Sequence, residues 1–147
     1  MRKGSITYLA HPVFTAYRRS GSVAILEMTE KAIRSMLDDR PLVETSLPRA
    51  GRITVRRQPA SSRDVLHLMM ATPVLRGELR GDNVQPIQDF LELRDVSVEL
   101  AADAAVRAVR VVPGGHIVEF RQDAGRLHFV LPSLRGHAAI EVVYETE

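Results

Sequence analysis

The hydrophobic period of this 147-residue chain changes at Pro41. Before that point Leu26, Ile33 and Leu37 recur at near-helical spacing, which predicts an amphipathic helix. Ser22 is suited to the N-cap of this helix, and Pro41 ends it because the residue before a proline avoids the helical conformation. After Pro41 the apolar residues alternate with polar ones, as in β-strands. The chain therefore divides into a helical piece and a run of strands.

The first piece, residues 1–40, contains two shorter elements before that helix. Residues 4–10 are expected to form a short strand, and residues 11–19 a brief helix with Pro12 in its first turn. Ser20-Gly21 breaks this helix. We interpret residues 1–40 as the tail of another domain.

The second piece, residues 41–147, is predicted to be mainly β: an antiparallel β-sandwich of about 7–8 strands, preceded by the N-terminal α-helical segment. Its strands recur with Gly and Pro between them, which is typical of a sandwich. Asp123-Ala124-Gly125 is expected to form a three-residue hairpin loop. The predicted strands cover residues 51–58, 64–71, 95–100, 105–112, 117–122, 126–131 and 137–144. Among these, residues 64–71 are so continuously apolar that we expect a central strand buried on both sides.

One connection, residues 72–93, is unusually long and has no clear period. Connections of this length are usually functional or contain short strands of their own. In a Greek-key sandwich it can also be the crossover between the two sheets.

The composition excludes several classes of protein. The chain has no cysteine, which rules out a disulfide scaffold, a cysteine nucleophile and a thiolate zinc site. No apolar run is long enough for a membrane span, and Met1-Arg2-Lys3 leads into no signal-peptide core. We therefore expect a cytoplasmic protein without a membrane partner.

The charge pattern does not favour nucleic-acid binding. The formal net charge is +2, and the basic residues are eighteen arginines and two lysines. A nucleic-acid site needs positive charge gathered on one face with aromatic residues among it. Here the arginines are scattered, with doublets at Arg18-Arg19 and Arg56-Arg57. We expect these side chains to be solvated and predict no nucleic-acid partner.

The five histidines suggest no preformed metal site, because no two of them have i,i+4 or HxH spacing. We therefore predict neither a metal nor another cofactor, although a site built from distant strands stays open. His67 falls in the middle of a predicted strand, where a hydrogen-bonded histidine in the core or between the sheets is expected.

The long connection carries the candidate carbohydrate contacts, since it contains the clustered acids Asp82, Asp89 and Glu92 and the aromatic Phe90. Glycosidases use two carboxylates, and sugar-binding modules use exposed aromatic rings. The alternative is that the acids are solvated loop charges and that Phe90 covers the end of the sandwich. The chain has no GxSxG elbow, GxGxxG motif or P-loop, so we assign no catalytic residue.

The order of several segments resembles the C-terminal end of bacterial glycoside hydrolases. The segments are YLAHPVFTAYRRSG, PLVETSLPRAGRITVRRQ, DVLHLMMATP, VQPIQDFLELRDVSVEL and VVPGGHIVEFRQDAGRLHFVLPSLRGHAAIEV. They look like the end of the middle domain and the final β-sandwich of enzymes related to family 42 β-galactosidases and to α-L-fucosidase-like hypothetical glycosyl hydrolases. Such enzymes place a TIM-barrel catalytic domain first and a flavodoxin-like trimerisation domain second.

This resemblance implies a non-catalytic accessory or assembly module, present as a truncated or separately encoded chain. The catalytic carboxylates of such enzymes lie on a barrel of roughly 250 residues, for which this chain has no room. We expect a homo-oligomer or a catalytic glycosidase chain as partner, with Leu26, Ile33 and Leu37 buried on the sandwich or on a second copy. The alternatives are a small carbohydrate-binding module and a standalone hydrolase that uses the acids of the long connection.

Overall fold

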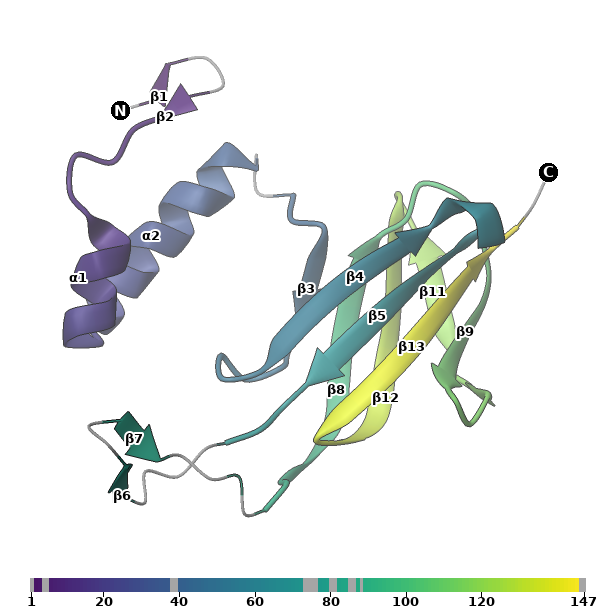
Figure 1. The fold of residues 1–147 in the computed structure, drawn as a ribbon. Coiled ribbons are helices and arrows are strands. Elements are labelled where there is room, and N and C mark those ends of the chain that lie inside the picture. The colour runs from purple at the N-terminus through teal and green to yellow at the C-terminus, as the bar shows by residue number, and fades with distance from the viewer. Residues whose placement is uncertain are drawn as a thin grey trace. The chain divides into compact units, whose positions relative to one another are not determined.

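The computed structural model describes residues 2–3, 6–37, 40–72, 77–79, 82–84, 87 and 89–145. The chain forms two compact units, Met1–Leu42 and Val43–Glu147. Figure 1 shows the elements of both. Each unit is described by itself below.

The first unit contains a small strand pair followed by two helices (Figure 1). Strands β1 (Arg2–Lys3) and β2 (Ile6–Thr7) are antiparallel, and helices α1 (Val13–Ser20) and α2 (Val23–Met36) follow them and contact each other. Gly21 ends α1 in the left-handed conformation, with φ of 61°, as glycine favours.

The ends of the two helices differ slightly from the predictions. Ser22 is the N-cap of α2 as expected, but its hydroxyl makes no capping hydrogen bond. Pro12 is the N-cap of α1, one residue before the predicted first-turn position. The proline still fits there because its missing N–H would have no partner inside the helix.

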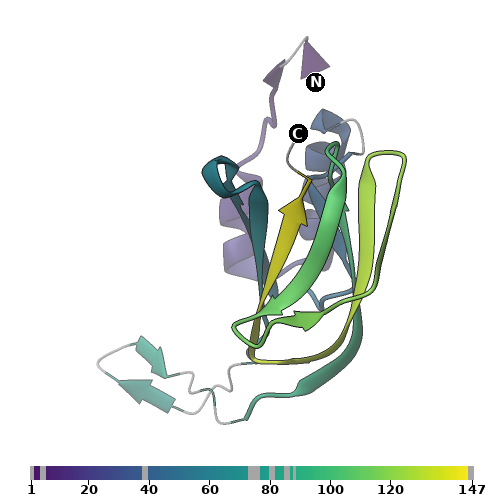
Figure 2. The same cartoon turned by 90° about the vertical axis from the view of Figure 1, so that its right-hand side faces the viewer.

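The second unit is an antiparallel β-sandwich, which confirms the predicted fold class. The five-stranded sheet has the order β10-β9-β13-β5-β4, and the four-stranded sheet has the order β11-β12-β8-β3. Figures 1 and 2 show the two sheets face to face. The strands are β3 (Val43–Thr45), β4 (Arg52–Gln58), β5 (Arg63–Met69), β8 (Glu92–Ala101), β9 (Val106–Val112), β10 (His116–Ile117), β11 (Phe120–Asp123), β12 (Arg126–Arg135) and β13 (His137–Tyr144).

The core lies between the sheets and is made of the alternate side chains of each strand. Leu66, Leu68 and Ile140 from the five-stranded sheet have no exposed surface, and neither have Leu100 and Leu127 from the four-stranded sheet. The prediction that residues 64–71 are buried on both sides is wrong. Burial alternates along β5, because one side of the strand faces the core and the outward side chains are only partly covered.

Two predicted elements differ from the structure at strand ends. The single strand expected over residues 117–122 is divided into β10 and β11, because the chain passes from one sheet to the other between them. The expected three-residue hairpin loop is a two-residue turn of Ala124 and Gly125, whose φ angles are 48° and 74°. Positive φ at both positions suits the twist of a tight hairpin.

The sequence pattern did not predict strand β3.

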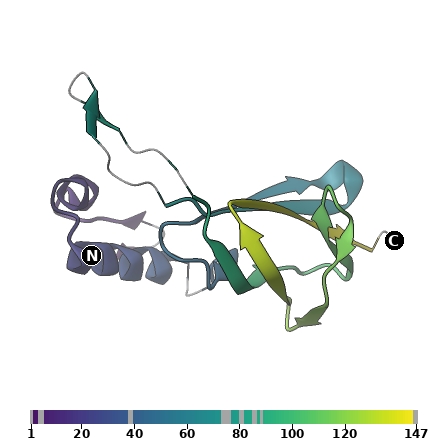
Figure 3. The same cartoon turned by 90° about the horizontal axis from the view of Figure 1, so that it is seen from below.

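The long connection is the crossover between the sheets, as the Greek-key interpretation proposed, since β5 and β8 belong to different sheets. It also contains two short strands of its own, β6 (Gly77–Leu79) and β7 (Asp82–Val84), which pair with each other. β5 ends and β8 begins at the end of the sandwich where β12 turns into β13 (Figure 3). This end is the place to look for the predicted carbohydrate contacts.

Candidate functional site

Phe90 lies at this end of the sandwich, against the turn between β12 and β13. A Cβ atom added to Gly136 would stand 2.9 Å from Cδ1 and 3.2 Å from Cε1 of the Phe90 ring. Gly136 has φ of +74° and is buried, so the ring covers a backbone position where only glycine fits well. Phe90 is nevertheless 48% exposed. Part of the ring therefore covers the sandwich, and part of it is open to solvent.

The acids of the long connection do not form one site among the residues that the structure describes. Glu92 accepts a hydrogen bond from Ser133 Oγ at 2.7 Å and pairs with Arg94 at 2.9 Å. These contacts, with the Ser133 hydrogen bond as the largest cause, lower the pKa of Glu92. Asp89 is exposed, and the side chain of Asp82 lies outside the described residues. Glu92 is thus held as an anion and does not have the raised pKa of a general acid.

A broad groove crosses the outward side of the four-stranded sheet. Its volume is about 1060 Å³. The strand register places Glu44, Glu99, His128 and Arg121 side by side on four adjacent strands. Residues of all four strands and of the β10 segment line the groove, including Ser46, Ser97, Ile117, Glu119, Val130 and Pro132. It offers polar groups beside apolar surface, which is the usual character of a small-ligand site.

Glu99 is a charged residue of this groove that two neighbouring side chains hold in place. Arg126 Nε lies 2.6 Å from Glu99 Oε1, and His128 Nδ1 lies 3.3 Å from Glu99 Oε2. The Arg126 hydrogen bond is the largest cause of the lowered pKa of Glu99. A carboxylate held in this way can accept hydrogen bonds from a ligand, but it is a poor proton donor.

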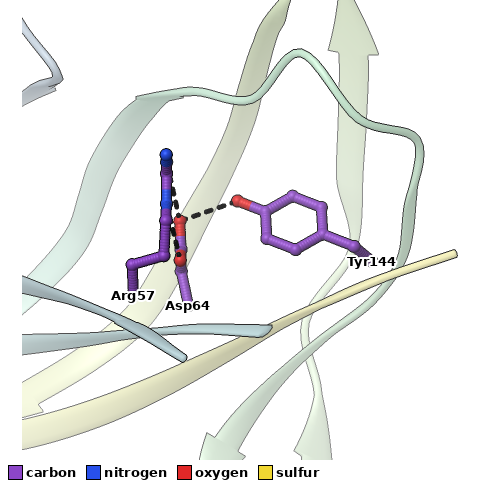
Figure 4. Close-up of polar contacts among 3 residues, drawn as sticks. All are labelled: Arg57, Asp64 and Tyr144. Atoms are coloured by element: carbon purple, nitrogen blue, oxygen red, sulfur yellow. Dashed lines mark hydrogen bonds and ion pairs between the residues drawn. The ribbon is translucent and has the colours of Figure 1, made fainter. Parts of the chain in front are cut away.

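A second polar cluster, formed by Arg57, Asp64 and Tyr144, lies at the other end of β5 (Figure 4). Asp64 is completely buried, and it accepts hydrogen bonds from Arg57 Nε at 3.2 Å and from Tyr144 Oη at 2.8 Å. Burial and the bond to Asp64 raise the pKa of Tyr144. All three residues lie on strands of the five-stranded sheet, and Asp64 accepts a hydrogen bond from each of the other two. We therefore interpret the cluster as a structural network.

The predicted interface residues lie on the last three turns of α2 and at its C-cap. Leu26 is partly buried, whereas Ile33 and Leu37 are 40% and 48% exposed. Met36 is exposed beside them. The expected burial of this stripe on the sandwich or on a second copy remains a prediction.

The histidines form one close pair. His67 lies on the outward side of β5, where it is partly exposed, and its Nδ1 is 3.1 Å from Nε2 of His137 on β13. The expectation that His67 sits in the core or between the sheets is wrong, although the expected hydrogen bond is present. Within the described part of the chain, no three His, Asp or Glu side chains are grouped so as to hold a metal ion.

Three features were missed by reasoning from the sequence. Glu99 and His128 were visible as outward positions of predicted strands, but Glu44 was not, because the three-residue β3 shows too little alternation. The pairing of His67 with His137 depends on the register of strands 70 residues apart. Asp64 is the first residue of the predicted strand 64–71, and its burial could not be inferred from the sequence.

No family model and no curated protein matches this chain. The solved structure of α-L-fucosidase isoenzyme 2 from Paenibacillus thiaminolyticus is similar to it, with a TM-score of 0.86 and 34% sequence identity. The similarity covers 95% of this chain and 21% of the fucosidase chain. No helix in the described part of the chain is long and apolar enough to cross a membrane. The comparison supports a glycoside-hydrolase-related domain that corresponds to about a fifth of a larger enzyme chain.

Proposed function

We propose that this chain is a non-catalytic accessory and assembly module of a glycoside hydrolase. The parent enzymes would be those related to family 42 β-galactosidases and α-L-fucosidases, and the compartment would be the cytoplasm. The observation that carries the proposal is the similarity itself: 95% of this chain matches 21% of a fucosidase chain at 34% identity. An identity of this size over nearly the whole chain supports a shared module, while most of the enzyme has no counterpart here.

The electrostatics of Glu92 and Glu99 do not favour a general-acid role for either residue. Hydrolysis of a glycosidic bond needs a pair of carboxyl groups, one of which is a general acid with a raised pKa. Glu92 and Glu99 both have lowered pKa values, because Ser133 and Arg126 donate hydrogen bonds to them. Neither carboxyl group is suited to hold a proton for a leaving group near neutral pH.

The apolar surface of α2 supports a role in assembly. Ile33, Met36 and Leu37 are all exposed at the C-terminal end of this helix. Clustered exposed apolar side chains commonly mark interaction sites, because covering them removes apolar surface from water. The partner we propose is a second copy of this chain or a catalytic glycosidase chain.

The proposal is tested with the full chain in two measurements. Light scattering after gel filtration should give a mass above that of the monomer, either for the chain alone or with a co-expressed glycosidase chain. Chromogenic aryl glycosides, including the α-L-fucoside, should not be hydrolysed by the purified chain. Turnover by the chain alone would refute the non-catalytic role, and a strict monomer with every tested partner would refute assembly.

The groove on the four-stranded sheet favours a second candidate function, carbohydrate binding. Its polar row can donate and accept hydrogen bonds from sugar hydroxyl groups through Arg121, His128 and Glu99, and Val130 and Ile117 supply apolar surface. A glycan array followed by titration calorimetry tests this function. His128→Ala should weaken any binding found, whereas His11→Ala, an exposed histidine of the first unit, should not.

A further inference from the structure

The pair of His67 and His137 has a geometry that the proposed function does not use. The ring planes are 12° apart, and the ring centres are separated by 5.3 Å. Nδ1 of His67 and Nε2 of His137 are 3.1 Å apart. The distance between the ring centres exceeds the distance between these nitrogens by roughly two ring radii. The two ring centres and the two nitrogens therefore lie nearly on one line, with the rings end to end and close to one plane. The facing nitrogens therefore point toward each other.

In this arrangement one imidazole N–H donates to the lone pair of the other ring, since a neutral imidazole has one donor and one acceptor nitrogen. A metal ion that binds both nitrogens takes the place of the shared proton, which moves to the other nitrogen of its own ring so that both imidazoles stay neutral ligands. Two nitrogens on one tetrahedral zinc ion stand about 3.3 Å apart, given Zn–N bonds of about 2.0–2.1 Å. The observed separation is close to that distance, but the two nitrogens face each other along one line, so both rings must turn before their lone pairs converge on one ion.

A third donor lies next to the pair by strand register. Met69 is directly opposite His137 in the pairing of β5 with β13, and it is two residues beyond His67 on the same outward side of β5. Met69 is 48% exposed. Its thioether is a soft ligand, which together with imidazole nitrogens favours Cu(I) among the biological metals.

The charges around the pair favour a monovalent ion. Arg52 lies directly opposite Met69 on β4. His67 pairs with Ala139, and Glu141 lies two residues farther along β13. Arg63 Nη1 donates a hydrogen bond to Glu141 Oε1 at 2.6 Å. The surroundings are thus cationic, and Coulomb repulsion from an arginine is twice as large for a divalent ion as for a monovalent one.

We propose that His67, His137 and Met69 form a binding site for a soft monovalent transition-metal ion, Cu(I), on the outward face of the five-stranded sheet. The site is independent of the assembly role and of the groove on the other sheet. It holds the ion on two strands whose register is fixed by the core, with solvent access through the exposed His137.

The site is tested by anaerobic competition between the full chain and a chromogenic Cu(I) chelator, bicinchoninate. The chain should remove one equivalent of Cu(I). His67→Ala and His137→Ala should each weaken this binding by roughly 100-fold or more, which is the upper range for loss of a supporting group around a metal. Met69→Leu should weaken Cu(I) binding and leave Zn(II) binding unchanged.

Matched controls are available in the same chain. His11→Ala and Met28→Leu remove donors of the same kind away from the pair, and these variants should bind Cu(I) as the parent does. Far-ultraviolet circular dichroism verifies folding, and His137→Gln serves as the second variant if an alanine variant unfolds. Failure of the chain to take Cu(I) from the chelator, unchanged affinity in the histidine variants, or equal affinity for Zn(II) would overturn the proposal.

Discussion

Arg57 donates hydrogen bonds to both carboxylate oxygens of Asp64, at 3.2 and 3.3 Å, although the two side chains differ completely in exposure. The Asp64 side chain has no exposed surface, whereas that of Arg57 is 64% exposed. The Arg57 guanidinium therefore lies between the buried carboxylate of Asp64 and the solvent, and it hydrogen-bonds to that carboxylate (Figure 4). Tyr144 provides the third hydrogen bond to the carboxylate.

Asp64→Ala should destabilise the sandwich by about 2–3 kcal/mol, the usual range for losing hydrogen bonds to a buried charged group. The exposure of Arg57 keeps the loss below that of a fully buried ion pair, because its charge remains solvated. Urea unfolding followed by circular dichroism measures the change. Asp103→Ala, which removes an exposed carboxylate, is the matched control and should change the free energy of unfolding much less.

Tyr144→Phe should lower stability near neutral pH, because it removes the hydrogen bond to Asp64, and should also flatten the fall of stability at alkaline pH. Burial and the Asp64 hydrogen bond raise the pKa of Tyr144, whereas tyrosine in the unfolded chain ionises near pH 10. The folded protein therefore binds more protons than the unfolded one above pH 10, and stability falls as pH rises from there. Phenylalanine removes this contribution, so the alkaline decline should be shallower than in the parent. An identical decline in Tyr144→Phe would contradict this assignment.

Glu99→Gln should flatten the loss of stability in acid. The Arg126 hydrogen bond lowers the pKa of Glu99 below its ordinary value of 4.5, so its stabilising contribution is present above pH 4.5 and disappears as pH falls through the lower folded pKa. Unfolding midpoints in urea between pH 6 and pH 3 measure the effect. Glu119→Gln, an exposed glutamate of the same groove, should retain the acid decline of the parent.

Gly136→Ala should be more destabilising than Gly115→Ala. Both glycines have positive φ, +74° and +70°, so each alanine has a conformational cost of about 1–2 kcal/mol. A Cβ atom at Gly115 would meet nothing within 4 Å, but one at Gly136 would be 2.9 Å from the Phe90 ring. We expect an additional cost of about 1–3 kcal/mol at Gly136 from overpacking. Thermal unfolding in a Phe90→Ala background should remove this difference.

Ile33→Glu should reduce the mass of the assembled particle measured by light scattering, because it places a charge in the exposed apolar stripe of α2. Leu37→Glu should have the same effect. Lys31→Glu introduces glutamate at an exposed polar position of the same helix and is the control. An unchanged mass in both stripe variants would remove Ile33 and Leu37 from the interface.

The sequence predicted the fold well where the hydrophobic pattern alone decides it. The alternation in residues 137–144 gives β13 with its full length, and the Ser22 N-cap and the Gly21 break are both present. Prediction failed where a tertiary feature overrides the local pattern. Residues 117–122 alternate as one strand, yet the chain changes sheets at Val118 and Glu119, and no local propensity encodes that step.

Functional positions were harder to predict than strands, because they depend on which strands become neighbours. Phe90 was found through its place in the long connection, but its contact with Gly136 requires the β12–β13 turn to lie beneath it. The row of Glu44, Glu99, His128 and Arg121 comes from four strands, and its members are spread over more than 80 residues of sequence. Single-sequence patterns give the side of a strand on which a residue lies, but not the residue opposite it.

The exposed edges of the two sheets limit how copies of this chain can associate. The edge strands are β10 and β4 in one sheet and β11 and β3 in the other. Three of these have only two to four residues, and the fourth, β4, carries Arg52, Arg56 and Arg57. The chain also runs directly from β3 to β4 and from β10 to β11, so each side of the sandwich is joined by covalent connections. Short and charged edges resist the strand addition that leads to fibrils. The sandwich is therefore protected against edge-to-edge aggregation, and ordered association has to rely on side-chain surfaces.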